Sequence, residues 1–288
     1  MSRRVLLAAI FAVMAVLALA LKPSDTVTGP PKPYQPASPI ATGDLPLHLE
    51  ALTWTEVRAL VRAGKTVAIV PTGGTEQNGP HMVLGKHNYV VRHTAARVAA
   101  RLGNALVTPV VTYVPEGRID PPEGHMAYAG TISIPPGVFA ATLEAAARSL
   151  RAHGFTTICF LGDSGGNQST QARVAAKLNA EWTDSGAQVI HVSDYYSGNG
   201  QTDWLLADGE TRSSIGSHAG IRDTSELLAV FPDGVRFDRR RPSTAPGMAN
   251  SGVIGDPTRA SAARGREMLR LKVEAAVRQI QDHLNPGS

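Results

Sequence analysis

The sequence predicts an α/β domain with a parallel or mostly parallel central sheet and helices on both faces. Apolar runs of strand length alternate with alanine-rich segments of helical periodicity, so the elements follow the order βαβα. Polar, glycine-rich loops directly follow the apolar runs, at the strand ends where such sheets bind ligands. The 288 residues, 43% of them hydrophobic, suffice for one domain of about 240 residues without the chain ends.

The N-terminus, residues 1–20, has the pattern of a secretory signal. Arg3 and Arg4 precede an uncharged run, and Ala18-Leu19-Ala20 forms a cleavage site. The paired arginines also resemble a twin-arginine export signal. The alternative is an uncleaved membrane anchor, because the apolar run is slightly long for a signal and slightly short for a span. Either way we expect an exported protein, periplasmic or extracellular, or tethered to a membrane.

Residues 21–46 follow as a proline-rich linker, because they hold seven prolines and few large apolar residues. The folded domain is therefore predicted over 47–288. It opens with a helix over 53–62, which Thr53 caps and Gly64 ends. The elements predicted after it are strand 67–71, helix 89–102, strand 105–114, an extended segment 131–134, helix 137–153, strand 155–161, helix 168–182, strand 187–193, a helical run ending near 231 and an amphipathic helix 260–284.

Metal-capable side chains cluster after the first strand. Glu76, His81 and His87 lie within twelve residues, so one loop can bring a carboxylate and two imidazoles together. The alternative is that Glu76 bonds loop amides and the histidines are solvated. His125 lies in a long loop, 115–130, and loops of that length inside a domain are usually functional.

Two later segments carry further candidates. The glycine-rich stretch 162–167, between a strand and a helix, lets the backbone approach a ligand, although a simple tight turn explains it equally. His218 and Asp223 precede the helical run near a glycine turn. Tyr195, Tyr196 and Trp204 are candidate pocket aromatics, with a place in the core as the alternative for each.

Charge and cysteine content exclude some classes. The net charge of +4 is spread out, and its one basic run, Arg239 to Arg241, lacks interleaved aromatics, which argues against nucleic-acid binding. The lone Cys159 lies in an apolar run. It cannot form an intrachain disulfide and is predicted to be a buried structural thiol.

Five motifs follow one another along the chain: PTGGTEQNGPH at 71–81, His125 ahead of Gly130-Thr131-Ile132, Gly165-Gly166-Asn167, His218-Ala219-Gly220 with Thr224-Ser225, and Gly252 to Pro257. In this order they resemble the creatininase family of creatinine amidohydrolase-like metal enzymes. The resemblance runs from about Leu52 to the C-terminal helix. It implies a layered α/β/α sandwich, usually in a homo-oligomer, with one or two divalent metals at the strand ends that hydrolyse amide or cyclic amide bonds.

The departures from this family fall on its metal ligands. In the family pattern E-Q-H-G-P-H-L-P-L-x-T-D the Glu, the first His and the final Asp bind metal. This chain keeps Glu76 but has Asn78 and His87 at the other two positions. In the pattern N-G-H-G-G-N the ligand His is replaced by Ser164, with Asp163 beside it. In H-A-G-x-x-E-T-S the Glu becomes Asp223.

We therefore predict an altered site in which Glu76, His87 and Asp163 hold one divalent metal (zinc, manganese or iron), or none. Three N/O ligands with an open position suffice for a catalytic ion, whereas the amide of Asn78 is too weak a ligand to rescue a second site.

From the resemblance, His218 is the predicted acid–base residue and His125 the second candidate. The predicted substrate contacts are His81, Asn78, Tyr195 and Asp223. The expected activity is metal-dependent hydrolysis of a C–N bond in a small amide or cyclic amide, by a homo-oligomer. The alternative is a non-catalytic exported ligand-binding protein or pseudoenzyme that keeps the fold but has lost the metals.

Overall fold

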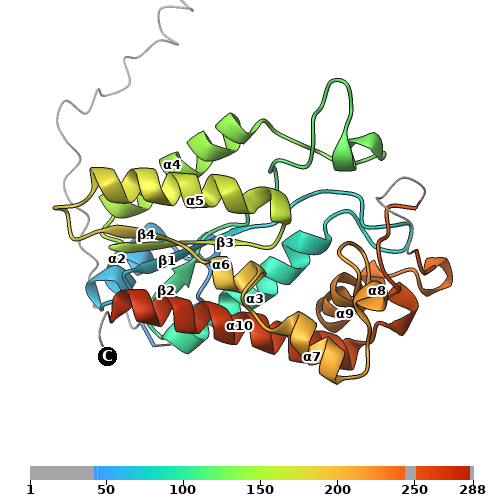
Figure 1. The fold of residues 1–288 in the computed structure, drawn as a ribbon. Helices are drawn as coiled ribbons and strands as arrows, with labels where there is room; N and C mark the ends of the chain where they lie inside the picture. The colour runs from blue at the N-terminus through green and yellow to red at the C-terminus, as the bar shows by residue number, and fades with distance from the viewer. Residues whose placement is uncertain (1–41, 44, 244–250, 286–288) are drawn as a thin grey trace, which may run out of the picture. The chain divides into compact units, whose positions relative to one another are not determined.

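The computed structural model describes residues 42–43, 45–243 and 251–285 (Figure 1). The strands are β1 (Val67–Thr72), β2 (Ala105–Val107), β3 (Thr157–Gly162) and β4 (Gln188–His191). The helices are α2 (Trp54–Arg62), α3 (Lys86–Leu102), α4 (Pro136–Ala152), α5 (Gly165–Glu181), α6 (Ser193–Tyr196), α7 (Gln201–Ala207), α8 (Arg212–Ile215), α9 (Ile221–Val230) and α10 (Ala262–Leu284). Short 3-10 turns include η2 (Gly124–Ala127).

The four strands form one parallel sheet in the order β2-β1-β3-β4. Val67 of β1 is in register with Ala105 on one side and Thr157 on the other, so the strands begin level with one another. All residues of β1 and β3 are buried, as expected for a sheet covered on both faces. The predicted parallel sheet is confirmed, and its carboxyl ends lie along one edge.

Alternate side chains of the sheet pack against different helices. Ile69 and Cys159 belong to a core cluster with apolar residues of α3 and α10. Val70 and Phe160 belong to another cluster, with residues of α4 and α5. Figure 1 shows α4 and α5 on one side of the sheet and α3 and α10 on the other. The layered α/β/α architecture is confirmed, and burial raises the pKa of the Cys159 thiol to about 12, which suits a structural residue.

Some element boundaries differ from the prediction. The second strand stops at Val107 rather than residue 114, because Pro109 follows closely and has no N–H for a sheet ladder. The segment 131–134 forms only isolated bridges, such as that between Thr75 and Ile132. Helix α3 begins at Lys86, three residues before the predicted start. His87 therefore belongs to the first turn of a helix and not to the loop before it.

Helices α9 and α10 approach each other closely at Gly265. A Cβ on this residue would lie 1.8 Å from the carbonyl oxygen of Ser225, so only glycine fits. The contact lies between two helices that both supply charged side chains to the pocket described below.

The predicted signal, residues 1–20, and nearly all of the predicted linker, 21–46, lie outside the described residues. Within the described ranges, no helix is both long and apolar enough to cross a membrane.

Candidate active site

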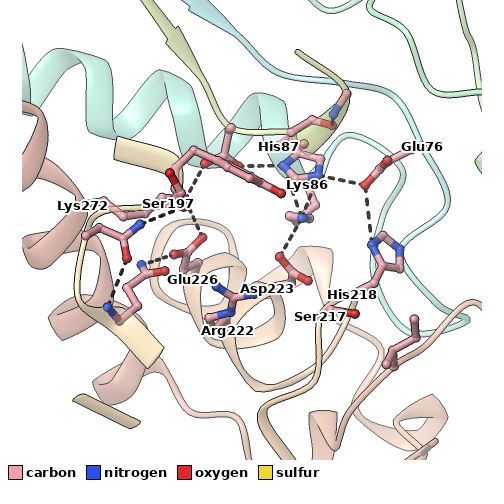
Figure 2. Close-up of a pocket in the computed structure, with 18 of the residues that line it drawn as sticks. Glu76, Lys86, His87, Ser197, Ser217, His218, Arg222, Asp223, Glu226 and Lys272 are labelled. Atoms are coloured by element: carbon pink, nitrogen blue, oxygen red, sulfur yellow. Dashed lines mark hydrogen bonds and ion pairs between the residues drawn. The ribbon is translucent and has the colours of Figure 1, made fainter. Parts of the chain in front are cut away.

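A pocket of about 830 Å³ opens at the carboxyl ends of β1 and β3 (Figure 2). Segments far apart in the sequence line it. Glu76 comes from the loop after β1, His125 from η2, Asp163 from the end of β3 and His218 from the loop before α9. The topology thus brings together at one sheet edge four residues that the sequence singled out, as parallel strands require.

His87 lies between two carboxylates. Its Nε2 is 2.8 Å from Oε1 of Glu76, and its Nδ1 is 2.7 Å from Oδ2 of Asp163. Burial and the nearby Lys86 favour the neutral ring, but the two carboxylates outweigh them and raise the pKa of His87 to about 9. At neutral pH the imidazolium therefore donates a hydrogen bond to each carboxylate.

Asp163 has further partners on its other oxygen. Its Oδ1 accepts from Nζ of Lys272 at 2.6 Å and from the hydroxyl of Tyr195 at 2.7 Å. Lys272 also lies 3.2 Å from Oε2 of Glu226, whose other oxygen accepts from Gln201 at 2.6 Å. Burial opposes ionisation of Asp163, but Lys272 and His87 hold its pKa far below the usual range.

The buried Lys86 forms a second ion pair, with the partly exposed Asp223. Its Nζ is 2.9 Å from Oδ1 of Asp223 and 2.9 Å from Nε2 of His87. The other oxygen of Asp223 accepts from the backbone N–H of Ala219 at 2.6 Å. Ala219 has a φ of 51°, a conformation that costs energy outside glycine, so this turn is held by its surroundings.

Glu76 faces two further imidazoles on its pocket side. Its Oε2 is 3.2 Å from Nε2 of His125, and its Oε1 is 3.9 Å from Nδ1 of His218. Gln77 fixes both rings, since its side-chain amide nitrogen lies 3.2 Å from Nδ1 of His125 and its backbone carbonyl oxygen lies 3.0 Å from Nε2 of His218. Burial lowers the pKa of both histidines, to about 4 for His218, so both rings are neutral at pH 7.

Among the described residues, Glu76, His125 and His218 form the one group whose ligand atoms could share a metal ion, all within 4.8 Å of one another. Two neutral imidazoles and a carboxylate suit zinc or manganese. A second ion finds no such set. The side chain of Asn78 is fully buried and donates to the backbone carbonyl of Glu76. The carboxylates of Asp223 and Asp163 are already paired with the ammonium groups of Lys86 and Lys272. The described residues therefore fit one ion and not two.

The predicted ligand set differs from this group. Glu76, His87 and Asp163 do come together, but His87 lies between the two carboxylates and directs one nitrogen at each. In this arrangement Glu76, His87 and Asp163 cannot surround one ion. Only Glu76 is common to the predicted ligand set and the candidate metal-binding group. His125 and His218, predicted as acid–base residues, belong to the candidate metal-binding group.

Three of the four predicted substrate contacts do not line the pocket. His81, Asn78 and Tyr195 are each 0% exposed and lie among the packed elements. His81 contacts the hydroxyl of Thr224 at 2.9 Å, and the hydroxyl of Tyr195 donates to Asp163 at 2.7 Å. Such buried polar groups satisfy their neighbours rather than a ligand. Asp223 does line the pocket, as does Tyr196 beside the buried tyrosine.

The sequence interpretation missed four charged residues. Lys86, Glu116, Glu226 and Lys272 all line the pocket and are nearly fully buried. A signal existed for Lys272, which lies one helical turn from buried residues on either side and so shares the core-facing stripe. Burial and the adjacent Glu76 carboxylate raise the pKa of Glu116 to about 9, so it holds a proton at neutral pH.

We expect the metal-free protein to be most stable near pH 6.5 and to lose stability on both sides. The pKa values of His87 and Glu116 rise on folding, from 6.5 and 4.5 to about 9. Their contribution to the free energy of unfolding is therefore lost as pH rises from the unfolded pKa values through about 9. Burial lowers the pKa of His81 and of His218 from 6.5 to about 4. These two groups therefore stabilise the folded state above pH 6.5, and this stabilisation is lost as pH falls toward 4.

Urea denaturation with a chelator, at pH 5 to 9, measures this profile. Each proton contributes at most about 1.4 kcal/mol per pH unit. In Glu116→Gln, which keeps the neutral shape, the fall between pH 6.5 and 9 should become shallower. A free energy of unfolding that stays level up to pH 9 in the unsubstituted protein would contradict the assignment.

Comparison with known proteins agrees with the α/β/α fold. Residues 50–280 match the family model for creatinine amidohydrolase. The mycofactocin precursor peptide peptidase of Mycobacterium tuberculosis is 29% identical over 74% of this chain and 83% of its own. The creatinine amidohydrolase of Pseudomonas putida is 26% identical over 82% and 96%. A crystal structure of creatinine amidohydrolase superposes with a TM-score of 0.69 at 25% identity, covering 84% of this chain and 99% of that one.

The fold and the pocket together define a class, an α/β/α amidohydrolase domain with a candidate metal centre at the carboxyl edge of its sheet. Within that class, the chain belongs to the creatininase family. Structures of similar creatininases are described as manganese and zinc–zinc forms.

Proposed function

We propose that this protein hydrolyses an amide C–N bond with one divalent ion held by Glu76, His125 and His218. The observation that carries the proposal is the convergence of these three ligand atoms in a solvent-open pocket. Membership of the creatininase family supports the reaction class. An ion in this position would supply Lewis acidity toward the carbonyl of the substrate.

The chain prepares this site in two ways. The His87 imidazolium donates to Glu76 and keeps it ionised, with its pKa well below the usual range despite burial. Gln77 orients both histidine rings: its backbone carbonyl accepts from Nε2 of His218, as partners of metal-binding histidines generally do, and its side-chain amide faces Nδ1 of His125. The ligands are thus oriented before any ion binds.

A short peptide or peptide-like amide is the substrate we favour over a small ring. The pocket volume of about 830 Å³ lies in the range that holds ligands much larger than a small lactam. Arg222 lines the pocket and forms no ion pair or hydrogen bond with other described side chains, so it can receive a carboxylate of the substrate. One of the relatives is named as a peptidase, which supports the same choice.

A non-catalytic ligand-binding protein is the second candidate. The observation in its favour is that Asn78 and Ser164 stand where the family pattern has metal-binding histidines. Export, membrane tethering and homo-oligomer formation stay predictions from the sequence and its resemblance.

Metal content and hydrolysis distinguish the two candidates. We expect the purified protein to bind one zinc or manganese ion per chain, measured by mass spectrometry of the metal after desalting. His125→Ala or His218→Ala should weaken binding at least tenfold. His283→Ala, on the exposed last turn of α10, serves as the matched control and should change nothing.

Hydrolysis would be followed by liquid chromatography and mass spectrometry on short peptides with free or amidated C-termini and on small lactams. Cleavage of free-acid peptides that requires the ion supports the proposal. A folded protein that binds no zinc or manganese and cleaves none of these substrates would favour the ligand-binding alternative.

A further inference from the structure

Beside the candidate metal-binding group, the pocket holds an unusual density of buried charge. Asp163 and Glu226 are each 3% exposed, and Lys86 and Lys272 are 1% and 5% exposed. Lysine is almost never buried to this extent unless it is paired, because an isolated ammonium group is strongly stabilised by water. Here every one of these groups is paired.

Lys272 bridges two carboxylates from different elements. Its Nζ lies 2.6 Å from Oδ1 of Asp163, at the end of β3, and 3.2 Å from Oε2 of Glu226, on α9. Two carboxylates joined through one positive centre is an arrangement that divalent ions commonly occupy in proteins. In Figure 2 the Lys272 side chain projects from α10 toward Glu226.

Lys86, the first residue of α3, provides a second fixed cation. It pairs with Asp223 at 2.9 Å and contacts His87. In the family pattern Lys86 and His87 occupy the positions of Thr and of the metal-binding Asp. The chain thus has two basic residues where the pattern has a neutral residue and an acid, and the acids that remain face ammonium groups.

We propose that Lys86 and Lys272 replace a second metal ion, and that the Lys272 ammonium covers a latent divalent-cation site formed by the carboxylates of Asp163 and Glu226. The lysines neutralise and position these acids without any metal. Carboxylate oxygens favour hard cations such as Mn²⁺. The proposal rests on the ion pairs of Lys86 and Lys272 and does not depend on hydrolysis.

Removal of the Lys272 side chain tests the proposal. Protein freed of metal with EDTA and desalted is titrated with Mn²⁺, with bound and free ion separated by electron paramagnetic resonance. We expect Lys272→Ala to bind one more Mn²⁺ ion than the unsubstituted protein, at least tenfold tighter than any second ion binds there. Mn²⁺ should also raise its Tm more than that of the unsubstituted protein.

Three controls isolate the effect. The extra ion should persist when His125→Ala and His218→Ala remove the site of the proposed function, so failure of that site is distinguishable. It should disappear in Lys272→Ala/Asp163→Asn/Glu226→Gln, which removes the acidic ligands. Lys177→Ala removes an exposed lysine paired with Glu144 and should gain no ion.

Two results would overturn the proposal. One is tight binding of two Mn²⁺ ions by the unsubstituted protein, and the other is a folded Lys272→Ala protein that gains none. If Lys272→Ala is unfolded without metal, Mn²⁺ must restore its circular dichroism, and failure to do so counts against the latent site.

Discussion

Replacing Asp163 by asparagine should lower the free energy of unfolding by roughly 3–5 kcal/mol, the cost of breaking a buried ion pair from one side. The carboxylate accepts from His87, Lys272 and Tyr195, and its side chain is 1% exposed. Asparagine keeps the shape but leaves Lys272 with Glu226 alone and the His87 imidazolium with Glu76 alone. Urea denaturation at pH 7 measures the loss.

Asp184→Asn provides the matched control for this substitution. Asp184 is exposed in the turn after α5, so its replacement should change stability by less than about 0.5 kcal/mol. A loss at Asp163 no larger than that at Asp184 would show that the buried cations do not depend on this carboxylate.

Replacing Glu76 by glutamine should reduce kcat/KM for a cleaved peptide on the order of 10³-fold, a change of about 4 kcal/mol in the activation free energy. Glutamine is nearly isosteric but removes the anionic ligand that faces His125 and His218. Binding of zinc or manganese should weaken in parallel, so metal analysis on the same samples links the two losses.

The comparison variant for Glu76 is Glu267→Gln, on the outer face of α10, where the carboxylate pairs with Arg270 alone among the described residues. Its kcat/KM should match that of the unsubstituted protein. If Glu76→Gln is folded and retains its ion and its kcat/KM, the site does not work through this carboxylate.

The architecture follows from local features of the sequence. Fully apolar runs such as 67–71 belong to strands buried on both faces, and alanine-rich segments of helical period belong to the layers that cover them. Since parallel strands end at one edge, the loops after β1 and β3 had to meet, and Glu76 and Asp163 do so. Short-range physics therefore sufficed for the sheet and for the location of the pocket.

The partners within the pocket could not be predicted in the same way. Lys86 pairs with Asp223 across 137 positions, and Lys272 pairs with Asp163 across 109. No periodicity encodes such pairs, since they depend on how α9 and α10 pack onto the sheet. Helical periodicity places Lys272 on the core-facing stripe of α10, but it does not say which carboxylates pair with the buried ammonium group.

The predicted substrate contacts His81, Asn78 and Tyr195 show a related limit. Their position near strand ends is correct, but sequence position does not say whether a polar side chain points into a pocket or under it. Asn78 bonds the backbone of its own loop, and Tyr195 bonds Thr94 and Asp163. Both side chains hold neighbouring parts of the protein in place and do not line the pocket.

The position of Lys272 on the last helix has a consequence for synthesis of the protein. Asp163 and Glu226 are translated well before α10, so the growing chain holds these acids without the Lys272 ammonium group until α10 emerges. A product truncated before residue 262 would retain the sheet strands but expose an unbalanced acidic pocket and the apolar face that α10 covers. Such a fragment should be readily degraded by proteases, so we expect a stable fold to require the synthesis of α10.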